Sequence, residues 1–245
     1  MNVTPVAHGE QRSGTAARRP AGSHLAERYL WFVLGVAVNS FAIALIARSN
    51  LGVGAISCVA YVLAEASGLS FGMFTFIVNM LFIVAQVVLL RRDFKPLQFL
   101  QVAVNIMFSS LIDLSGTLLA ALPLDTLPAQ IATLSVGCAL LALGIAVEVA
   151  PNVLLVPGEG IVRAISAVTK KPFGTCKAAF DCSLVIIATV LSFVLCGRLV
   201  GVGVGTVVSA IIVGRIVNAY NRHLPLLAHI AGLTRTNSGS PEEAP

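Results

Sequence analysis

Long apolar runs separated by short polar segments dominate the sequence. Six runs are long enough to cross about 30 Å of hydrocarbon as helices, at 1.5 Å per residue. These runs cover residues 29–47, 71–90, 97–121, 129–149, 173–196 and 203–220. The pattern therefore predicts an all-α fold, that of a polytopic helical membrane protein with about six transmembrane helices.

Two further apolar stretches, 51–67 and 154–169, are shorter and begin with glycine-rich sequence. Each leaves only about 12–15 helical residues, roughly 20 Å, which is too short to cross a bilayer. We therefore expect two re-entrant half-helices. The alternative is that both stretches span, which would give eight transmembrane helices.

The positions of Lys and Arg distinguish these two topologies. With two re-entrant segments and a cytoplasmic N-terminus, the basic loop 91–95, Lys170 and Arg222 all lie inside, and the loop 122–128, which lacks Lys and Arg, lies outside. This arrangement obeys the positive-inside rule, and Arg198 is its one exception. It predicts cytoplasmic termini, with a disordered tail over 1–26 and a C-terminal tail over 223–245.

An internal repeat becomes visible when residues 29–90 are moved forward by 102 positions onto 131–192. The matched pairs include Gly35 with Gly137, Asn50 with Asn152, Phe71 with Phe173 and, as a near match in shape, Asn79 with Asp181. Each copy, 27–125 and 126–222, then holds three spans and one half-helix. An odd number of spans inverts the second copy, and inverted repeats with broken helices are a transporter architecture. The alternative is an old duplication that now serves only packing.

Composition narrows the function classes. Only 11% of residues are charged and 57% are hydrophobic, whereas a soluble domain has about 25% charged residues. The basic residues form no stripe with interleaved aromatics, so we expect no nucleic-acid partner. All four histidines lie in the tails, and the cysteines form no Cys-x-x-Cys pair. We therefore expect no enzyme activity, no metal site and no cofactor.

The second half also carries a recognisable series of motifs. They are Pro157-Gly158-Glu159-Gly160, Phe173-Gly174 with Lys177, Phe180-Asp181, and Gly201-Val202-Gly203-Val204-Gly205-Thr206. In this order and spacing they resemble the YczE/YyaS/YitT group of bacterial integral membrane proteins, in particular a YczE-like subgroup. The resemblance covers residues 29–220. It implies a multi-pass protein of the bacterial inner membrane and implies no particular activity.

Ionisable side chains inside the predicted spans are costly and need a reason. Asp113 shares a helix face with Asn105 and Ser109, so this polar face is expected to point into the bundle. Lys177 and Asp181 are spaced i, i+4 and can pair. The alternatives are that Lys177 and Arg215 snorkel to the surface, and that Asp113 and Asp181 are hydrogen-bonded structural groups. Glu148, at the inner end of its span, is expected to be interfacial.

The glycines that open the two short segments allow two interpretations. Sharp turns there could expose backbone N–H groups at a helix N-terminus, where an anionic group fits. The other interpretation is a tight turn with close helix contact. The glycine-rich stretch 201–206 lacks the Gly-Lys-Ser/Thr ending of a P-loop, and its four-residue spacing favours close packing of the last span.

These considerations lead to one set of candidate substrate-binding residues. The set is Asn50, Gly52, Gly54, Asn79, Asp113, Gly158, Glu159, Gly160, Arg163, Lys177, Asp181 and Arg215. The leading hypothesis is a small secondary transporter or facilitator of a small polar solute, with Asp113 and Asp181 as proton carriers if transport is coupled. The alternative is a non-transporting membrane subunit or accessory partner. The expected partners are the lipid bilayer and the solute, and homo-oligomerisation is left open.

Overall fold

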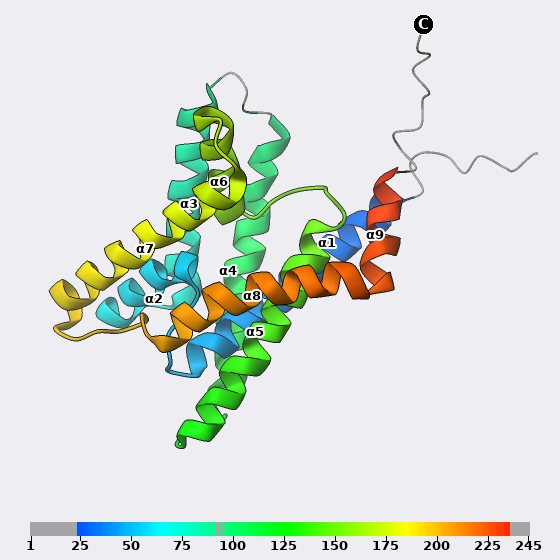
Figure 1. The fold of residues 1–245 in the computed structure, drawn as a ribbon. Coiled ribbons are helices and arrows are strands. Elements are labelled where there is room, and N and C mark those ends of the chain that lie inside the picture. The colour runs from blue at the N-terminus through cyan, green and yellow to red at the C-terminus, as the bar shows by residue number, and fades with distance from the viewer. Residues whose placement is uncertain (1–23, 92–93, 95, 236–245) are drawn as a thin grey trace, which may run out of the picture.

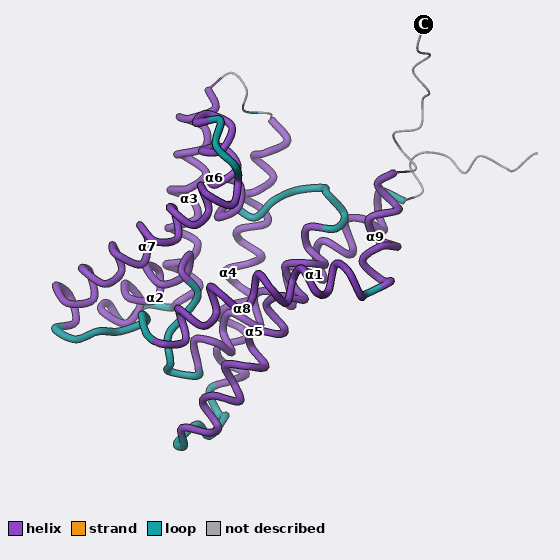
Figure 2. Tube along the Cα trace, viewed as in Figure 1, coloured by secondary structure: helices purple, strands orange, loops and turns teal. Residues whose placement is uncertain are grey.

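The computed structural model describes residues 24–235 apart from 92, 93 and 95, and in this part every regular element is a helix (Figures 1 and 2). The elements are α1 (Leu25–Arg48), α2 (Ala55–Ser67), α3 (Phe71–Leu90), the 3₁₀ helix η2 (Pro96–Phe99), α4 (Leu100–Leu119), α5 (Leu127–Val149), α6 (Pro157–Thr169), α7 (Phe173–Cys196), α8 (Val204–His223) and α9 (Pro225–Arg235). The expected disordered tail 1–26 lies almost wholly outside the described residues.

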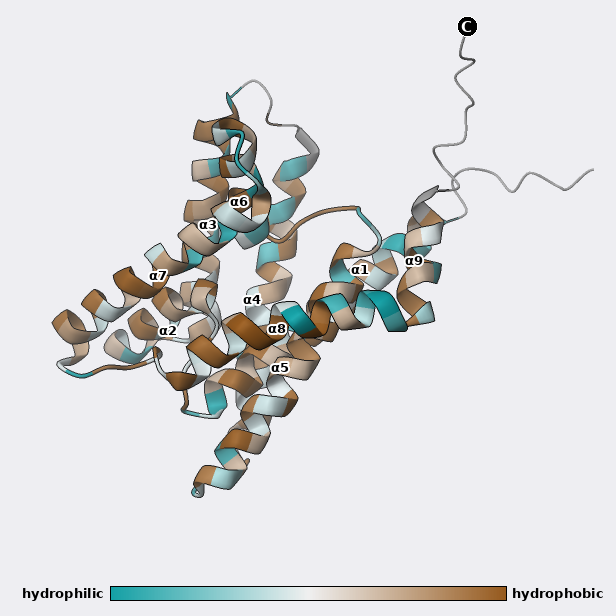
Figure 3. Ribbon diagram, viewed as in Figure 1, coloured by the Kyte–Doolittle hydropathy of each residue, from teal (hydrophilic) through white to brown (hydrophobic). Residues whose placement is uncertain are grey.

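Six of these helices, α1, α3, α4, α5, α7 and α8, are long and apolar enough to cross a membrane. Figure 3 shows brown, hydrophobic residues along these helices, and many of their apolar side chains are exposed. Val194 on α7 and Val204 on α8, for example, are 73% and 76% exposed. Such surfaces are unfavourable in water and suit a lipid environment. The all-helical, multi-pass membrane architecture predicted from hydropathy is therefore confirmed at this level.

The two short helices have 13 residues each, which corresponds to about 20 Å. Helix α2 begins after Gly54 in extended conformation and ends at Gly68, whose φ is +73°. Helix α6 begins after Val156 in the same conformation and ends at Lys170, with φ +56°. A left-handed residue after the last turn is a common helix stop. Neither helix is long enough to cross a bilayer alone. That both are re-entrant stays a prediction.

The two halves of the chain share one plan. The bounds of α2 and α6 differ by 102 residues at both ends, and α1 and α5, like α3 and α7, begin 102 residues apart. Asn50 and Asn152, also 102 apart, both adopt positive φ, +58° and +48°. The contacts follow the same rule, because α3 packs on α6 as α7 packs on α2. These matches support the repeat. The inverted orientation of its second copy stays a prediction.

Helices α1 and α5 form the largest helix contact of the bundle, and two glycines make it close. A Cβ atom added to Gly35 on α1 would lie 2.5 Å from the backbone nitrogen of Glu148 on α5. One added to Gly144 on α5 would lie 2.7 Å from the backbone nitrogen of Asn39 on α1. The backbones therefore touch at two reciprocal points, as small residues allow in membrane bundles.

One asymmetry separates the halves. Helices α3 and α4 pack together, whereas α7 and α8, which occupy the corresponding places in the second half, have no comparable contact. Figure 1 shows α7 and α8 diverging beyond the loop that joins them. The described parts of α7 and α8 are also the least buried of the six long helices, at 17% each.

The chain after α8 does not leave the bundle at once. Helix α9 packs with Leu227 and Ile230 against Ala146 and Val147 of α5. The predicted C-terminal tail, 223–245, thus begins with a helix docked on the bundle.

Candidate functional site

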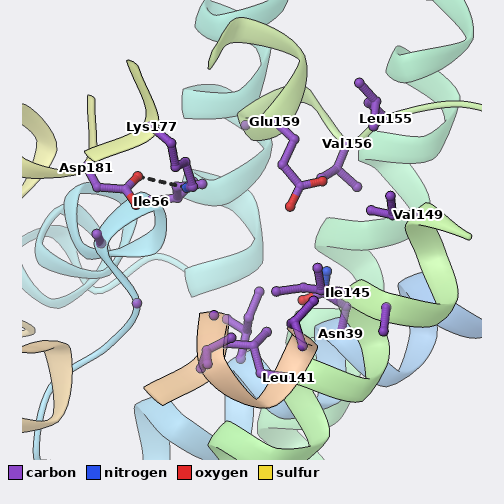
Figure 4. A pocket seen from close by; sticks show the side chains of 18 of the residues that line it. Asn39, Ile56, Leu141, Ile145, Val149, Leu155, Val156, Glu159, Lys177 and Asp181 are labelled. Carbon is purple, nitrogen blue, oxygen red and sulfur yellow. Dashed lines mark hydrogen bonds and ion pairs between the residues drawn. The ribbon is translucent and has the colours of Figure 1, made fainter. Parts of the chain in front are cut away.

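A cavity of about 1130 Å³ lies at the centre of the bundle (Figure 4). Its lining comes from all nine α-helices of the described residues or from the segments beside them, and most of it is apolar. Four charged side chains interrupt the apolar wall. They are Glu159 and Arg163 from α6 and Lys177 and Asp181 from α7. Since a charge inside a membrane bundle is costly, four of them around one cavity mark it as the candidate site.

The first turns of both short helices face this cavity. Gly54 to Ser57 line it at the start of α2, and Gly158 and Glu159 line it at the start of α6. The first N–H groups of a helix have no partner within the helix and carry a partial positive charge. The first turn of α6 contains the acid Glu159, whereas the first turn of α2 contains none. The partial positive charge at the start of α6 is therefore offset by a carboxylate in its first turn, whereas the one at the start of α2 is not.

Lys177 and Asp181 form the predicted ion pair. Lys177 Nζ donates a hydrogen bond to Asp181 Oδ1 over 2.8 Å, and the two side chains are 29% and 24% exposed. Figure 4 shows the pair on one wall of the cavity, with Glu159 reaching in from another helix. Glu159 lines the same cavity as the pair, so all three charged side chains border one space.

Asn79, the repeat counterpart of Asp181, also lines the cavity. Its Nδ2 donates to Asn105 Oδ1 over 2.9 Å, and Asn105 Nδ2 donates in turn to the backbone oxygen of Phe76 over 3.0 Å. Both amides are buried. The polar face predicted on residues 97–121 does point into the bundle at Asn105, where it ties α4 to α3.

Asp113, on the same helix, has a different role. Its Oδ2 accepts a hydrogen bond from the Ser70 hydroxyl at 2.6 Å, and its Oδ1 accepts one from the backbone N–H of Gly72 at 2.7 Å. It thus caps the N-terminus of α3, where a carboxylate is favoured by the helix dipole. Asp113 does not line the cavity. The structure supports the alternative considered above, a hydrogen-bonded structural acid.

Four other candidate residues also lie away from the cavity. Asn50 and Gly52 adopt positive φ in the turn before α2, where Gly52 approaches the N-terminus of α8. Gly160 packs against the amide of Gln86. Arg215 is exposed on α8, which fits the snorkelling alternative.

The glycine-rich stretch 201–206 does serve packing. The backbone N–H of Gly205 donates to Leu51 O over 2.7 Å, and the N–H of Val53 donates to Gly201 O over 2.9 Å. A Cβ atom on Gly203 would lie 2.5 Å from the same Leu51 oxygen. This stretch therefore holds the turn that leads into α2 in place through backbone hydrogen bonds and close packing.

Glu148, which was expected at the membrane interface, is covered by protein. It is only 1% exposed and lies in the crossing of α1 and α5, close to the end of α5. Its Oε2 accepts a hydrogen bond from Asn39 Nδ2 at 2.8 Å. Asn39 lines the cavity, so Glu148 stands directly behind the wall.

Comparison with known protein families gives one match to the chain. The model of a family of unknown function, DUF6198, matches residues 26–222, which contain the four charged residues of the cavity. The chain belongs to this family. The match ends where α8 ends, so DUF6198 includes all six long helices and both short ones. Comparisons with curated proteins and with solved structures give no match. Membership of the YczE/YyaS/YitT group stays a prediction.

Proposed function

We propose that the protein is a small secondary transporter or facilitator, which moves a small polar solute across the bacterial inner membrane through its central cavity. The observation that carries the proposal is the position of the charges. Glu159, Arg163, Lys177 and Asp181 border one cavity of about 1130 Å³ that lies between the helices of the bundle. Solute pockets are usually apolar cavities with a few placed polar groups, and this lining has that character.

The proposed site uses the start of both short helices. Gly54 and Ser57 present the first turn of α2, and Glu159 presents the first turn of α6. Two re-entrant helices whose N-termini meet at the substrate are typical of inverted-repeat transporters. Under this proposal the second copy is inverted and both termini lie in the cytoplasm. No catalytic step is proposed.

The state described here suggests how the solute enters. Helices α3 and α4 are packed together, whereas α7 and α8 are apart, and both α7 and α8 contribute side chains to the cavity. We propose that the solute enters between α7 and α8 in this conformation, and that these two helices come together in a second conformation. Switching between the two conformations would open the fixed site to one side of the membrane at a time, as in other transporters with related halves.

The first experiment identifies the solute. A library of small polar compounds is screened for those that raise the melting temperature of the purified protein, because a ligand stabilises in proportion to its occupancy. Hits are then tested for uptake in proteoliposomes. The proposal fails if no stabilising compound is taken up.

Two variants test the ion pair in that assay. Lys177→Ala leaves Asp181 without its cation, which costs about 3–5 kcal/mol when the pair is desolvated, and less here because both side chains are partly exposed. Asp181→Asn keeps the shape and reproduces the amide of Asn79. If Asp181 carries a proton, Asp181→Asn folds and binds solute but loses pH-driven uptake. Glu65→Gln, at an exposed ion pair with Arg198, is the matched control and keeps uptake.

A second candidate function is a non-transporting membrane subunit. The observation in its favour is the small buried share of α7 and α8, 17% each, which leaves two long apolar faces for a partner helix as well as for lipid. Copurification distinguishes the two functions. A transporter moves solute when reconstituted alone, whereas a subunit is isolated with a membrane partner and is inactive without it.

A further inference from the structure

The first turn of α2 presents hydrogen-bond donors to the cavity. Gly54, Ala55, Ile56 and Ser57 all line it. The N–H groups of the first three residues have no hydrogen bond within the described residues, and no side chain caps the helix. A Cβ atom on Gly54 would meet nothing within 4 Å, so there is open space beside these donors. Helix N-terminal N–H groups are normally satisfied by a cap, by water or by a ligand.

Ser57 adds a hydroxyl group to the same turn. It is only 8% exposed, yet it lines the cavity. Other helical hydroxyls, such as those of Ser40 and Thr75, donate to the backbone oxygen four residues earlier. The Ser57 hydroxyl has no hydrogen-bond partner in the part of the chain that the structure describes. Because buried polar groups are normally paired, this hydroxyl is a second, independent indication of a ligand at the start of α2.

The internal repeat indicates what the ligand supplies. A shift of 102 positions places Ala55 on Pro157 and Ser57 on Glu159. In α6, Pro157 has no N–H group to satisfy, and Glu159 provides a carboxylate in the first turn. In α2, Ala55 keeps its N–H group and the first turn contains no acid. A carboxylate offsets the partial positive charge of a helix N-terminus. Helix α6 therefore carries this group itself, whereas α2 has open space lined by donors.

The surroundings of this turn favour a single negative charge. Helix α2 packs on α7, with Cys58 Sγ 3.6 Å from Leu184 O. Within two turns before Leu184, α7 carries the ion pair of Lys177 and Asp181, and Figure 4 shows Ile56 next to this pair. The two charges of the pair cancel. The donors of α2 therefore set the sign of the local potential, which suits a monoanion better than a multiply charged ion such as phosphate.

We propose that the solute is a small organic monocarboxylate, whose carboxylate group binds the first N–H groups of α2 and the Ser57 hydroxyl. Helix N-termini are general binding sites for anionic groups. Much of the remaining cavity wall is apolar, with Ile43, Ile145 and Val213 among its residues, and it suits an apolar body on the same molecule. The inference names the substrate class of the proposed transport site, and it rests on the proposed function only for movement across the membrane.

The experiment measures the melting temperature of the full-length protein in detergent, at fixed pH and with NaCl keeping the ionic strength constant. The probes are sodium acetate, butyrate and hexanoate, the amide of each acid, butylamine hydrochloride and sodium phosphate. We expect at least one carboxylate to raise the melting temperature in a saturable way, with the unfolding equilibrium shifted about 100-fold at 100 times Kd. The amides, the amine and phosphate should give a much smaller shift. Equilibrium binding of the ¹⁴C-labelled carboxylate is the second readout.

Variants of Ser57 test the site. Ser57→Asp reproduces the first turn of α6, so it should keep the melting temperature of the ligand-free protein and lose carboxylate binding. Ser57→Asn has nearly the same size as the Asp variant without its charge and should still bind. Ser57→Ala removes one hydrogen bond to a charged group and should weaken binding by about 10- to 100-fold. The control is Ser67→Ala, because the Ser67 hydroxyl bonds to Leu63 O at the other end of α2. It should bind normally.

A backbone variant keeps the test valid if Ser57→Asp does not fold. Ala55→Pro removes one N–H group and copies Pro157. Proline is well tolerated at the first position of a helix, and Gly54 already has the extended conformation, φ −60° and ψ 148°, that a residue before proline prefers. This variant should fold and bind the carboxylate more weakly. Ala55→Val adds a similar volume, keeps the N–H group and should bind better than Ala55→Pro.

Two outcomes overturn the inference. In one, no carboxylate stabilises the protein more than its own amide does. In the other, carboxylate binding is unchanged in both Ser57→Ala and Ala55→Pro. Carboxylate binding at this turn without uptake in proteoliposomes would keep the site and remove the transporter proposal. Uptake of a solute that has no carboxylate group, without carboxylate binding, would do the reverse.

Discussion

Asn79 on α3 donates a hydrogen bond from Nδ2 to Oδ1 of Asn105 on α4, over 2.9 Å, and this bond joins two long helices inside the bundle. Asp181, 102 residues after Asn79, has no such link to α8. It pairs with Lys177 on its own helix and faces the cavity. The same helical position therefore joins α3 to α4 in the first half of the chain, whereas in the second half it lines the cavity.

The closed pair gives the first prediction. Asn79→Leu removes the donor and leaves Asn105 Oδ1 buried without a partner, so it should destabilise the protein by about 1–3 kcal/mol. The double variant Asn79→Leu/Asn105→Leu removes both groups and should cost less than the sum of the single changes. Thermal unfolding of all three variants in detergent measures the coupling. Strict additivity would show that the bond contributes nothing to the α3–α4 contact.

The glycines that open the short helices give the second prediction. A Cβ atom on Gly54 meets nothing within 4 Å, whereas one on Gly160 would lie 2.6 Å from Gln86 Oε1. Gln86 is 1% exposed and bonded to Gln101, so it has little room to yield. Gly160→Leu should therefore destabilise the fold by about 1–3 kcal/mol through overpacking. Gly54→Leu should fold normally and weaken solute binding, because its side chain enters the cavity.

Melting temperature and ligand binding, measured on the same two preparations, check this difference. From the sequence alone, both changes are expected to impair function more than membrane insertion. Equal melting temperatures for the two variants would support the expectation from sequence. They would also contradict the tight packing of Gly160 against Gln86.

The helices were predictable because hydropathy and length depend on local sequence. The spans 71–90 and 173–196 were predicted with the bounds that α3 and α7 have. The 102-residue offset predicted that α2 and α6 would match. Helix α9 was missed, although Pro225 at its start and the spacing of Leu227, Ile230 and Leu233 on one face were available signals.

The four charged residues of the cavity wall, Glu159, Arg163, Lys177 and Asp181, were all among the candidates named from sequence. What each side chain meets across the bundle was not predictable. Glu148 sits near the end of its helix, and nothing in the local sequence reveals that α1 covers it. The signal that could have found it is the pair of four-residue spacings, Gly35 to Asn39 and Gly144 to Glu148, which places each polar residue one turn from a close-packing glycine. Asp113 was expected in the site because its partners, Ser70 and Gly72, are 41 or more residues away.

Membrane topology gives the third prediction. In a variant without its native cysteines, a single cysteine at Thr169 should react with an impermeant thiol reagent from the cytoplasmic side, and one at Asp125 from the outside. Both residues are exposed. The reason is the distribution of Lys and Arg, with Lys170 and Lys171 beside Thr169 and a loop without basic residues around Asp125.

A third cysteine provides the decisive control. Asp93 lies outside the described residues, in the basic loop that the re-entrant topology places in the cytoplasm. Labelling of a cysteine at Asp93 from the outside would mean that α2 crosses the membrane. It would contradict the inverted repeat and, with it, the main architectural support for transport.

The last prediction concerns the gap between α7 and α8. If the second half closes as the first half is closed, Asp181 on α7 should approach Ser209 on α8. Ser209 stands five residues after the start of α8, as Asn105 stands five residues after the start of α4, and the side chains of Asp181 and Ser209 already line the cavity. In a variant without native cysteines, Asp181→Cys with Ser209→Cys should then form a disulfide under mild oxidation, which requires Cα atoms within about 7 Å.

The pair Asn79→Cys with Asn105→Cys, whose native side chains are in contact, is the positive control and should crosslink readily. The pair Ile186→Cys with Ile211→Cys, on the exposed faces of the same two helices, is the negative control. A solute that favours the closed state should raise the crosslinking rate of the first pair alone. No crosslink at Asp181 and Ser209, under conditions that crosslink Asn79 and Asn105, would show that α7 and α8 stay apart and that access does not alternate in this way.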